Sequence, residues 1–337
     1  MKLKITIYLL LIASISMFGQ NITKSGTTAA QFLKIGVGSR AIGMGGAFTA
    51  TADDFTASYW NPAGLAANKS NEAFFNHSNW IMDVSFDYAG FATYIPDVGT
   101  IGAFVSILNS IDGMLVRTEE EPEGTGEKFD AGAMAIGLSY ARNLTDRFSI
   151  GFNAKYIREY IWHESATGFA LDVGALYKIN ILNEFRIAAS ISNFGTKMKL
   201  DGRDIMEIKQ VGEAGQGNLI NSFIELEEWD LPLLFRFGLA ADVIKTEDTR
   251  LTTAIDAVHP NDHTEYLNTG VEYSWNEILF ARAGYTSLFE VDSEKGYTFG
   301  LGLNYRVMQS VRVMIDYAYQ DMDRLGSLHY LSFGIKF

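Results

Sequence analysis

The sequence predicts an all-β protein: a transmembrane antiparallel β-barrel of about 14 strands with an N-terminal hatch inside its lumen. Three observations predict this fold. From about residue 72 onward, apolar residues alternate with small or polar ones, as side chains do on the two faces of a strand. The segments with this pattern are even in number and are joined by alternately short and longer connections. The last segment ends on an aromatic residue.

The alternation is clear in the stretch TFGLGLNY. Phe299, Leu301 and Leu303 share one face there, and the residues between them are small or polar. A soluble β-sandwich would alternate in the same way. However, many of the apolar faces begin or end in aromatic residues, and charged residues occupy the opposite faces, which favours a barrel in a membrane over a sandwich.

Fourteen segments are predicted as strands. They are 72–79, 83–95, 99–108, 131–141, 147–160, 166–178, 184–193, 233–243, 250–258, 264–274, 278–287, 296–306, 310–320 and 328–337. Every second connection is a tight turn, whereas the alternating set includes two long loops, 109–130 and 194–232. Outer-membrane barrels have short turns on the periplasmic side and longer loops outside. We therefore expect both long loops to face the exterior of the cell.

The first residues predict export from the cytoplasm. Lys2 and Lys4 precede an apolar run that ends at Phe18, and Gly19 follows it, so residues 1–19 are predicted to be a signal peptide. No later segment has the roughly 18 uninterrupted apolar residues that a membrane helix needs. The formal net charge of −13 argues against nucleic acid as a partner. The absence of cysteine excludes disulfides and thiolate metal sites.

Residues 20–70 do not fit the strand pattern, and residues 71–337 are predicted to form the barrel. The early segment is rich in glycine, which permits close approach to a neighbouring wall, and Asp53 or Asp54 can begin a short helix over Phe55 to Trp60. Pro62 prevents that helix from continuing. We expect this segment to fold into the lumen as a hatch. Its candidate residues are the glycines Gly43, Gly45 and Gly46 and the turn Asn61, Pro62, Ala63 and Gly64.

Residues 28–67 contain an Ala-Asp-Asp step and a Trp-Asn-Pro-Ala-Gly step. This stretch resembles the N-terminal signature of the PorV/PorQ family. That family is itself similar to the FadL-type outer-membrane transporters, whose N-terminal hatch also carries an Asn-Pro-Ala turn. The resemblance implies a 14-stranded barrel with an internal hatch in the outer membrane of a Gram-negative bacterium of the Bacteroidota or their relatives. It also implies a role that some members have in the type IX protein secretion system, either carrying cargo or belonging to the complex that attaches cargo to the surface.

The end of the chain, HYLSFGIKF, places apolar residues on one face of the last strand. Phe333, Ile335 and Phe337 resemble the C-terminal signal by which bacterial outer-membrane barrels are handed to their insertion machinery. We expect outer-membrane lipid and this machinery to be partners of the chain.

Catalytic chemistry finds little support in the sequence. It contains no nucleophile elbow and no phosphate-binding loop in the required context, so we expect no enzyme activity, no cofactor and no catalytic residue. His259 and His263 lie on a predicted outer loop, where a metal site is not expected. The charges predicted to face the lumen are expected to form ion pairs that join the wall to the hatch. They are Lys155, Arg186, Arg236, Arg282, Arg312, Asp172, Asp242, Asp256 and Asp316.

Two functions, and as a third a purely structural role in the outer membrane, remain open from the sequence. The first is a non-enzymatic binding or assembly component in protein secretion or surface attachment, with secreted cargo and secretion-machinery proteins as partners and the two long loops as the working surface. The alternative is a FadL-like transporter that takes up hydrophobic small molecules. In that case Asn61, Pro62 and Gly64 gate the route; otherwise they are the turn that seats the hatch. Phe280, Leu176 and Leu234, at inward positions, leave room for a small apolar pocket.

Overall fold

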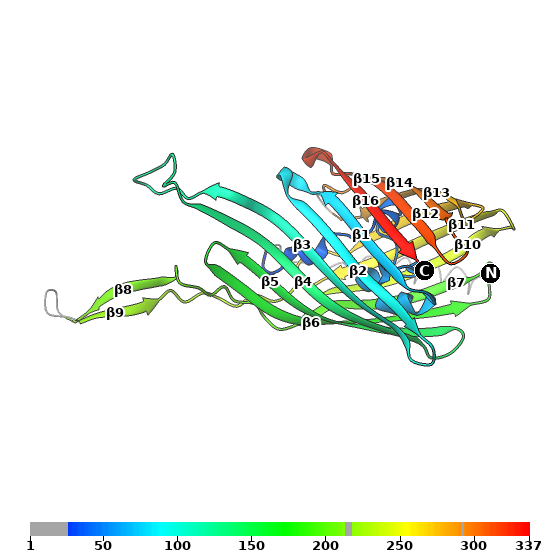
Figure 1. The fold of residues 1–337 in the computed structure, drawn as a ribbon, viewed down its shortest axis with the longest axis horizontal. Helices are drawn as coiled ribbons and strands as arrows, with labels where there is room; N and C mark the ends of the chain where they lie inside the picture. The colour runs from blue at the N-terminus through cyan, green and yellow to red at the C-terminus, as the bar shows by residue number, and fades with distance from the viewer. Residues whose placement is uncertain (1–25, 213–217, 291–292) are drawn as a thin grey trace, which may run out of the picture.

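A computed structural model describes residues 26–212, 218–290 and 293–337 of the chain (Figure 1). The predicted signal peptide, residues 1–19, lies outside the described residues. Within the described ranges, the helices are too short or too polar for any of them to cross a membrane.

Fourteen antiparallel strands form a closed barrel in which each strand pairs with its neighbour along the chain and the first pairs with the last. The strands are β1 (Glu72–Asn79), β2 (Ser85–Ile95), β3 (Gly99–Leu115), β4 (Lys128–Asn143), β5 (Phe148–Ile161), β6 (Glu164–Ile179), β7 (Phe185–Gly195), β10 (Leu234–Lys245), β11 (Thr249–Pro260), β12 (Tyr266–Trp275), β13 (Leu279–Leu288), β14 (Tyr297–Arg306), β15 (Arg312–Asp321) and β16 (Ser327–Lys336). The predicted fold class and all fourteen predicted barrel strands are confirmed.

Two features of the loops differ from the prediction. Strands β3 and β4 extend well into the segment 109–130, so that only residues 116–127 connect them. Register shifts between Asn109 and Met114 interrupt the alternation there, because a bulge displaces one residue from the period of two. In addition, the segment 194–232 contains a separate two-stranded sheet of β8 (Met206–Val211) and β9 (Asn218–Phe223).

The two faces of the wall have opposite character. Along β6, Phe169, Leu171 and Val173 are exposed on the outside, whereas Ala170 and Asp172 between them are buried in the lumen. An apolar outward face and a small or polar inward face are what a barrel surrounded by lipid requires. The alternation of the sequence therefore separates the lipid face from the lumenal face.

The two ends of the barrel differ in their connections. One end carries the turns 96–98, 144–147, 180–184, 246–248, 276–278 and 307–311, together with both ends of the barrel chain. The other end carries the long connections 116–127 and 196–233. By the usual asymmetry of outer-membrane barrels, the short-turn end is the periplasmic end and the long-loop end is extracellular.

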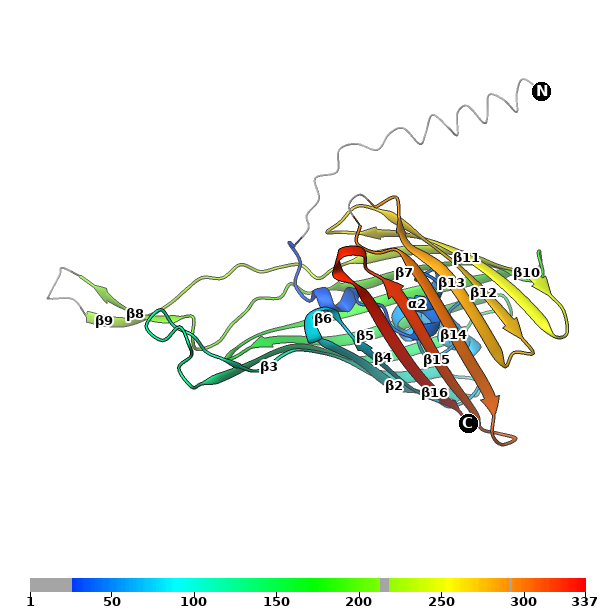
Figure 2. The same ribbon diagram turned by 90° about the horizontal axis from the view of Figure 1, so that it is seen from above.

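Residues 26–71, called the N-terminal segment below, pass through the barrel from one end to the other. At the extracellular end the Ala29 N–H donates to the Asp230 carbonyl at 2.9 Å, and at the periplasmic end the Asn71 N–H donates to the Phe337 oxygen at 3.0 Å. Between these points the segment forms the short helices η1 (Gln31–Lys34), α2 (Ser39–Gly43), α3 (Ala57–Trp60) and η2 (Pro62–Ala67). Figure 2 shows α2 with strands of the barrel on both sides of it.

The predicted helix over Phe55 to Trp60 is shorter in the structure and begins at Ala57. Asp54 precedes it and accepts a hydrogen bond from the Thr56 backbone at 2.9 Å. The helix ends before Asn61, whose backbone is extended, as expected for a residue before proline. Two further single-turn helices, η3 (Ile81–Asp83) and η4 (Asp323–Leu325), lie in extracellular connections.

We expect the purified protein to be heat-modifiable. A closed ladder of backbone hydrogen bonds leaves no free edge, so the folded barrel resists detergent until it is boiled. Unheated and boiled samples should therefore migrate differently on a denaturing gel. Identical mobility, together with recovery in a soluble periplasmic fraction, would contradict a membrane barrel.

Candidate functional site

The turn Asn61–Gly64 is buried against the inner wall of the barrel. The Asn61 Nδ2 group donates to the Thr49 carbonyl at 2.9 Å and to the Ala175 carbonyl of β6 at 3.2 Å. Its Oδ1 atom accepts from the Ala63 N–H at 3.1 Å. One asparagine side chain thus connects two parts of the N-terminal segment to a barrel strand.

Glycines on the wall allow this turn to approach so closely. A Cβ atom placed on Gly174 of β6 would lie 2.0 Å from Asn61 Oδ1, and one on Gly151 of β5 would lie 2.2 Å from the Pro62 carbonyl carbon. Gly64 is equally confined, because its Cβ would lie 2.1 Å from the Ala52 oxygen. The space between turn and wall therefore admits no side chain at these positions.

The predicted hatch glycines face the opposite side of the barrel. Gly43 lies against Gly300 of β14, where its Cβ would be 2.9 Å from the Gly300 Cα. Gly45 and Gly46 both have positive φ, at +66° and +73°, a conformation that glycine adopts readily. A Cβ on Gly45 would lie 2.6 Å from the Thr269 oxygen of β12. All three glycines thus lie where helix α2 and the turn after it contact the wall.

A buried carboxylate holds α2 to the wall. Glu272 of β12 is 1% exposed and accepts from Arg40 Nε at 2.9 Å, from Arg282 Nε at 2.7 Å and from Arg250 Nη2 at 3.3 Å. Arg282 also pairs with Asp316 at 2.6 Å. A buried carboxylate with three guanidinium partners is well compensated, and of these partners Arg40 belongs to the N-terminal segment. The sequence pattern missed both Arg40 and Glu272 as lumenal partners.

The predicted lumenal charges mostly form ion pairs, but these pairs join wall strands to one another and not, as predicted, the wall to the hatch. Asp256 of β11 instead accepts backbone hydrogen bonds from Phe48 at 2.9 Å and Thr49 at 2.8 Å. The guanidinium of Arg236 lies 5.5 Å from the ring centre of Tyr59 and 5.4 Å from that of Trp60, a cation–π arrangement. The pairs are Lys155 with Asp172 at 2.7 Å, Arg186 with Asp242 at 2.6 Å and Arg282 with Asp316 at 2.6 Å.

A second anchor lies at the extracellular end of the N-terminal segment. Lys34 Nζ pairs with Asp262 at 2.9 Å, and Gln31 Nε2 donates to the same carboxylate at 2.8 Å. Burial alone would raise the pKa of Asp262, but the hydrogen bonds from Gln31 and Lys34 lower this pKa below its ordinary value. The ionised Asp262 carboxylate therefore stabilises the folded state fully above pH about 4, the pKa of an unfolded aspartate. This stabilisation is lost as the pH falls through the lower pKa of the folded protein.

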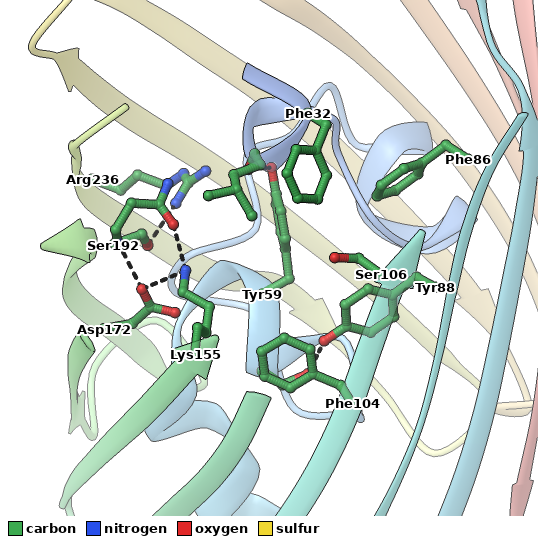
Figure 3. Close-up of a pocket in the computed structure, with 13 residues that line it drawn as sticks. Phe32, Tyr59, Phe86, Tyr88, Phe104, Ser106, Lys155, Asp172, Ser192 and Arg236 are labelled. Carbon is green, nitrogen blue, oxygen red and sulfur yellow. Dashed lines mark hydrogen bonds and ion pairs between the residues drawn. The ribbon is translucent and has the colours of Figure 1, made fainter. Parts of the chain in front are cut away.

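A small cavity remains between the N-terminal segment and the wall (Figure 3). Lys155 contacts Asp172 on one side of it and donates to Asn193, while Arg236 donates to Ser192 Oγ at 3.2 Å. The cavity measures about 20 Å³, which is room for about one water molecule. Aromatic rings line its other side in Figure 3: Phe32, Tyr59, Phe86, Tyr88 and Phe104.

Tyr59 contributes a polar contact at this cavity. Its hydroxyl donates to the Leu33 carbonyl at 3.2 Å.

The inward apolar residues of the prediction contribute to packing. Phe280, Leu176 and Leu234 are all buried. None of these three side chains lines the cavity in Figure 3.

His259 lies near the end of β11 and not on a loop as predicted, His263 lies in the loop after it, and the two side chains have different partners. His259 pairs with Glu265 at 3.0 Å and His263 with Glu290 at 2.9 Å. Over the described parts of the chain, no group of three or more His, Cys, Asp or Glu side chains is arranged to hold a metal ion.

The hairpin of β8 and β9 projects beyond the extracellular end of the barrel (Figure 1, Figure 2). Its register places Met206 opposite Phe223 and Gln210 opposite Leu219. Because opposed residues share a face and successive residues alternate, one face of the hairpin is largely apolar and the other largely polar. The apolar face carries Met206, Ile208, Leu219 and Phe223, of which Ile208 and Leu219 are 67% and 73% exposed.

The last strand and the residue that follows it carry the predicted assembly residues on the outer face of the barrel. Phe333 and Phe337 are exposed and Ile335 is partly exposed. Phe337 also lies 6.2 Å from Phe91 of β2, measured between ring centres. These three side chains therefore lie on the lipid side of the barrel.

The comparisons with known proteins fit this geometry. A family model described as type IX secretion system protein PorV matches residues 19–257, which is more than half of the chain. No curated protein matches the sequence significantly.

Solved structures with the same fold include the CymD monoaromatic hydrocarbon channel, with a TM-score of 0.57 and 12% identity over 90% of this chain and 97% of that one. The toluene transporter TodX of Pseudomonas putida has a TM-score of 0.56 and 12% identity over 89% and 97% of the two chains. A FadL homologue of Pseudomonas aeruginosa has a TM-score of 0.54 and 11% identity over 89% and 98%. At these identities the likeness is one of fold.

We expect Gly174→Ala to loosen the Asn61–Gly64 turn, because the added methyl would lie 2.0 Å from Asn61 Oδ1. Overpacking of this kind costs about 1–3 kcal/mol. The measurements are the temperature at which the folded gel band disappears and the rate at which protease cuts the N-terminal segment. The matched control is Gly102→Ala, another buried wall glycine, whose Cβ has its nearest neighbour at 3.3 Å. Equal effects of the two substitutions would show that the close approach at Gly174 does not matter.

Proposed function

Because this chain belongs to the PorV family of type IX secretion system proteins, we propose that it is a non-enzymatic binding component in protein secretion or surface attachment. Its closed barrel of fourteen strands is an outer-membrane barrel of a Gram-negative bacterium. Its partners in this proposal are secreted cargo and proteins of the secretion machinery. The family match and the shape of the extracellular end support the proposal.

The single observation that carries it is the projecting hairpin. An isolated hairpin is marginally stable in water, and this one exposes four large apolar side chains on one face. Its two outer edges also present backbone groups beyond the β8–β9 pairing, which is the arrangement that an added strand from another chain can use. An apolar face and open edges on the same hairpin favour a protein partner over a small solute.

We propose further that residues 20–70 act as a hatch within the barrel of residues 71–337, after removal of residues 1–19 as a signal peptide. The ion pairs of Arg40 and Lys34 and the buried Asn61 turn support a segment that is fixed in place. In this proposal Asn61, Pro62, Ala63 and Gly64 seat the hatch, and Gly43, Gly45 and Gly46 let it contact the wall.

The alternative is uptake of hydrophobic small molecules. It is favoured by the fold shared with proteins described as a monoaromatic hydrocarbon channel and a toluene transporter, and by the Asn61–Pro62 turn at the wall. The cavity beside that segment, at about 20 Å³, is far too small for an aromatic hydrocarbon. A larger cavity, of about 170 Å³, also borders this segment at Asp53 and Asp54, but charged side chains make up most of its lining, which disfavours an aromatic hydrocarbon.

We expect the double substitution Ile208→Ser and Leu219→Ser to abolish partner binding while the barrel stays folded. Burial of one such side chain contributes about 2 kcal/mol, so loss of two lowers affinity by at least tenfold. The measurement is the amount of each type IX cargo protein that reaches the surface and the medium, together with its recovery after gentle detergent extraction. Glu207→Ser with Lys209→Ser, on the polar face of the same hairpin, is the matched control and should leave secretion unchanged.

The opposite pattern would favour uptake. If the apolar-face variant secretes every cargo normally, and Asn61→Ala with Pro62→Ala blocks growth on a hydrophobic carbon source, the secretion proposal is wrong. If the Asn61–Gly64 turn only seats the hatch, the same Asn61 and Pro62 variant should instead grow normally and leak small solutes.

Phe333, Ile335 and Phe337 are proposed to be read by the barrel-insertion machinery during assembly. Deleting Phe337 should then reduce the amount of protein that reaches the outer membrane at equal synthesis, because recognition precedes folding. The thermal stability of the barrels that do assemble should change little, since Phe337 follows the last residue of β16. Wild-type amounts after the deletion would show that Phe337 is simply one more lipid-facing side chain.

A further inference from the structure

A row of positive charges crosses three strands at the periplasmic end of the barrel. Arg306 at the end of β14 lies opposite Arg312 on β15, and Arg312 lies opposite Lys336 on β16. Directly opposed residues share one face of a sheet, and like charges in that position are destabilising. Arg312 lies four residues from Asp316, which pairs with Arg282 inside the barrel. The row is therefore on the lumenal side of the rim.

The protein itself neutralises only one end of this row. Lys336 Nζ lies 3.4 Å from Glu72 Oε2. Within the described ranges of the chain, neither Arg306 nor Arg312 has a carboxylate at ion-pair distance. The acidic groups of the adjoining cavity are already engaged: Asp53 and Asp54 pair with Arg40, Glu277 with Arg250 and Asp316 with Arg282. Two guanidinium groups thus remain without a counter-charge in a protein whose net charge is −13.

The row borders a cavity that is open to the periplasmic end. This cavity has a volume of about 250 Å³, far more than the roughly 15 Å³ that one water needs. Ser70, Gln309 and Ser310 contribute hydroxyl and amide groups to its lining, beside the three cations. A second cavity of about 170 Å³ adjoins it through Arg312 and Lys336. The site therefore offers cations, neutral donors and space in one place.

The rim beside this cavity is apolar. Val307 and Met308, in the turn that follows Arg306, are 54% and 65% exposed. Phe337, which also borders the cavity, is exposed on the outer face. Cations next to exposed apolar side chains at the end of a transmembrane element are typical of the membrane interface, where lipid headgroups lie.

We propose that this pocket binds the phosphate group of a phospholipid from the periplasmic leaflet, with its acyl chains outside the barrel against Val307, Met308 and Phe337. A guanidinium group presents two parallel N–H donors that match phosphate oxygens. A bound phosphate between Arg306 and Arg312 also removes the repulsion between them. The exposed apolar turn favours a lipid over an acidic peptide, which would bring no acyl chains to that turn.

The test uses the full-length protein purified in detergent, with lipid adducts counted by native mass spectrometry. The probes are palmitoyl-oleoyl phosphatidylglycerol and the diacylglycerol with the same acyl chains, which lacks the phosphate. The wild-type protein should retain phosphatidylglycerol and not diacylglycerol, and Arg306→Gln with Arg312→Gln should lower the affinity for phosphatidylglycerol at least tenfold. The matched control is Lys178→Gln, which removes a cation near the same end that already pairs with Glu184 at 3.3 Å.

Folding of each variant is checked by heat-modifiability, and Arg312→Gln alone serves if the double variant does not assemble. Equal retention of phosphatidylglycerol by the wild type and the double variant would overturn the proposal, as would equal retention of the two lipids. Displacement of phosphatidylglycerol by an equal concentration of inorganic phosphate would show a site for free anions instead. Binding of a hexaglutamate peptide in preference to the lipid would show a protein site.

Discussion

Pairing of β1 with β16 is the contact on which the rest of the structure depends. In hydrocarbon every backbone N–H and C=O group needs a partner within the protein, so a sheet can cross a membrane only as a closed ring. The eight register pairs from Glu72 with Lys336 to Asn79 with His329 close this one. Closure also brings the two ends of the barrel chain together, where Asn71 and Phe337 exchange two backbone hydrogen bonds.

A closed ring creates a lumen. Here the lumen is filled by the N-terminal segment, and the charged groups that face it need partners. The wall meets this need with small residues where backbone approaches backbone, as at Gly174 against Asn61 and at Gly300 against Gly43. Elsewhere it uses charges with partners, as at Glu272. The two solutions are complementary, because glycine removes the side chains that would hold the N-terminal segment away, and the ion pairs then fix its position. This division explains why a strand such as β14 has apolar side chains on its outer face and places Gly300 and Gly302 on its inner face.

The strands were predictable from the sequence because lipid on one face and lumen on the other impose the same alternation on all fourteen. Prediction failed where that constraint ends. Beyond the bilayer, β3 and β4 continue through bulges that break the period, and β8 and β9 form a hairpin outside the barrel, where lipid imposes no alternation. In the lumen, the Asn61 turn and the glycines were recognisable from local backbone chemistry. Their counterparts were not, because Arg40 and Glu272 are 232 residues apart in the sequence and only the closed ring makes them neighbours.

A filled lumen changes where function can be located. The N-terminal segment is held at both ends and in the middle, by Asp262, Glu272 and the wall around Asn61, so any route through the barrel requires several contacts to break together. The rims carry no such constraint, and they differ in kind. At the extracellular end an apolar face is exposed to water on the hairpin of β8 and β9, which favours a protein surface that can cover it. At the periplasmic end, unpaired cations lie beside apolar side chains at the level of the lipid headgroups, and there the membrane itself is the partner with the matching chemistry.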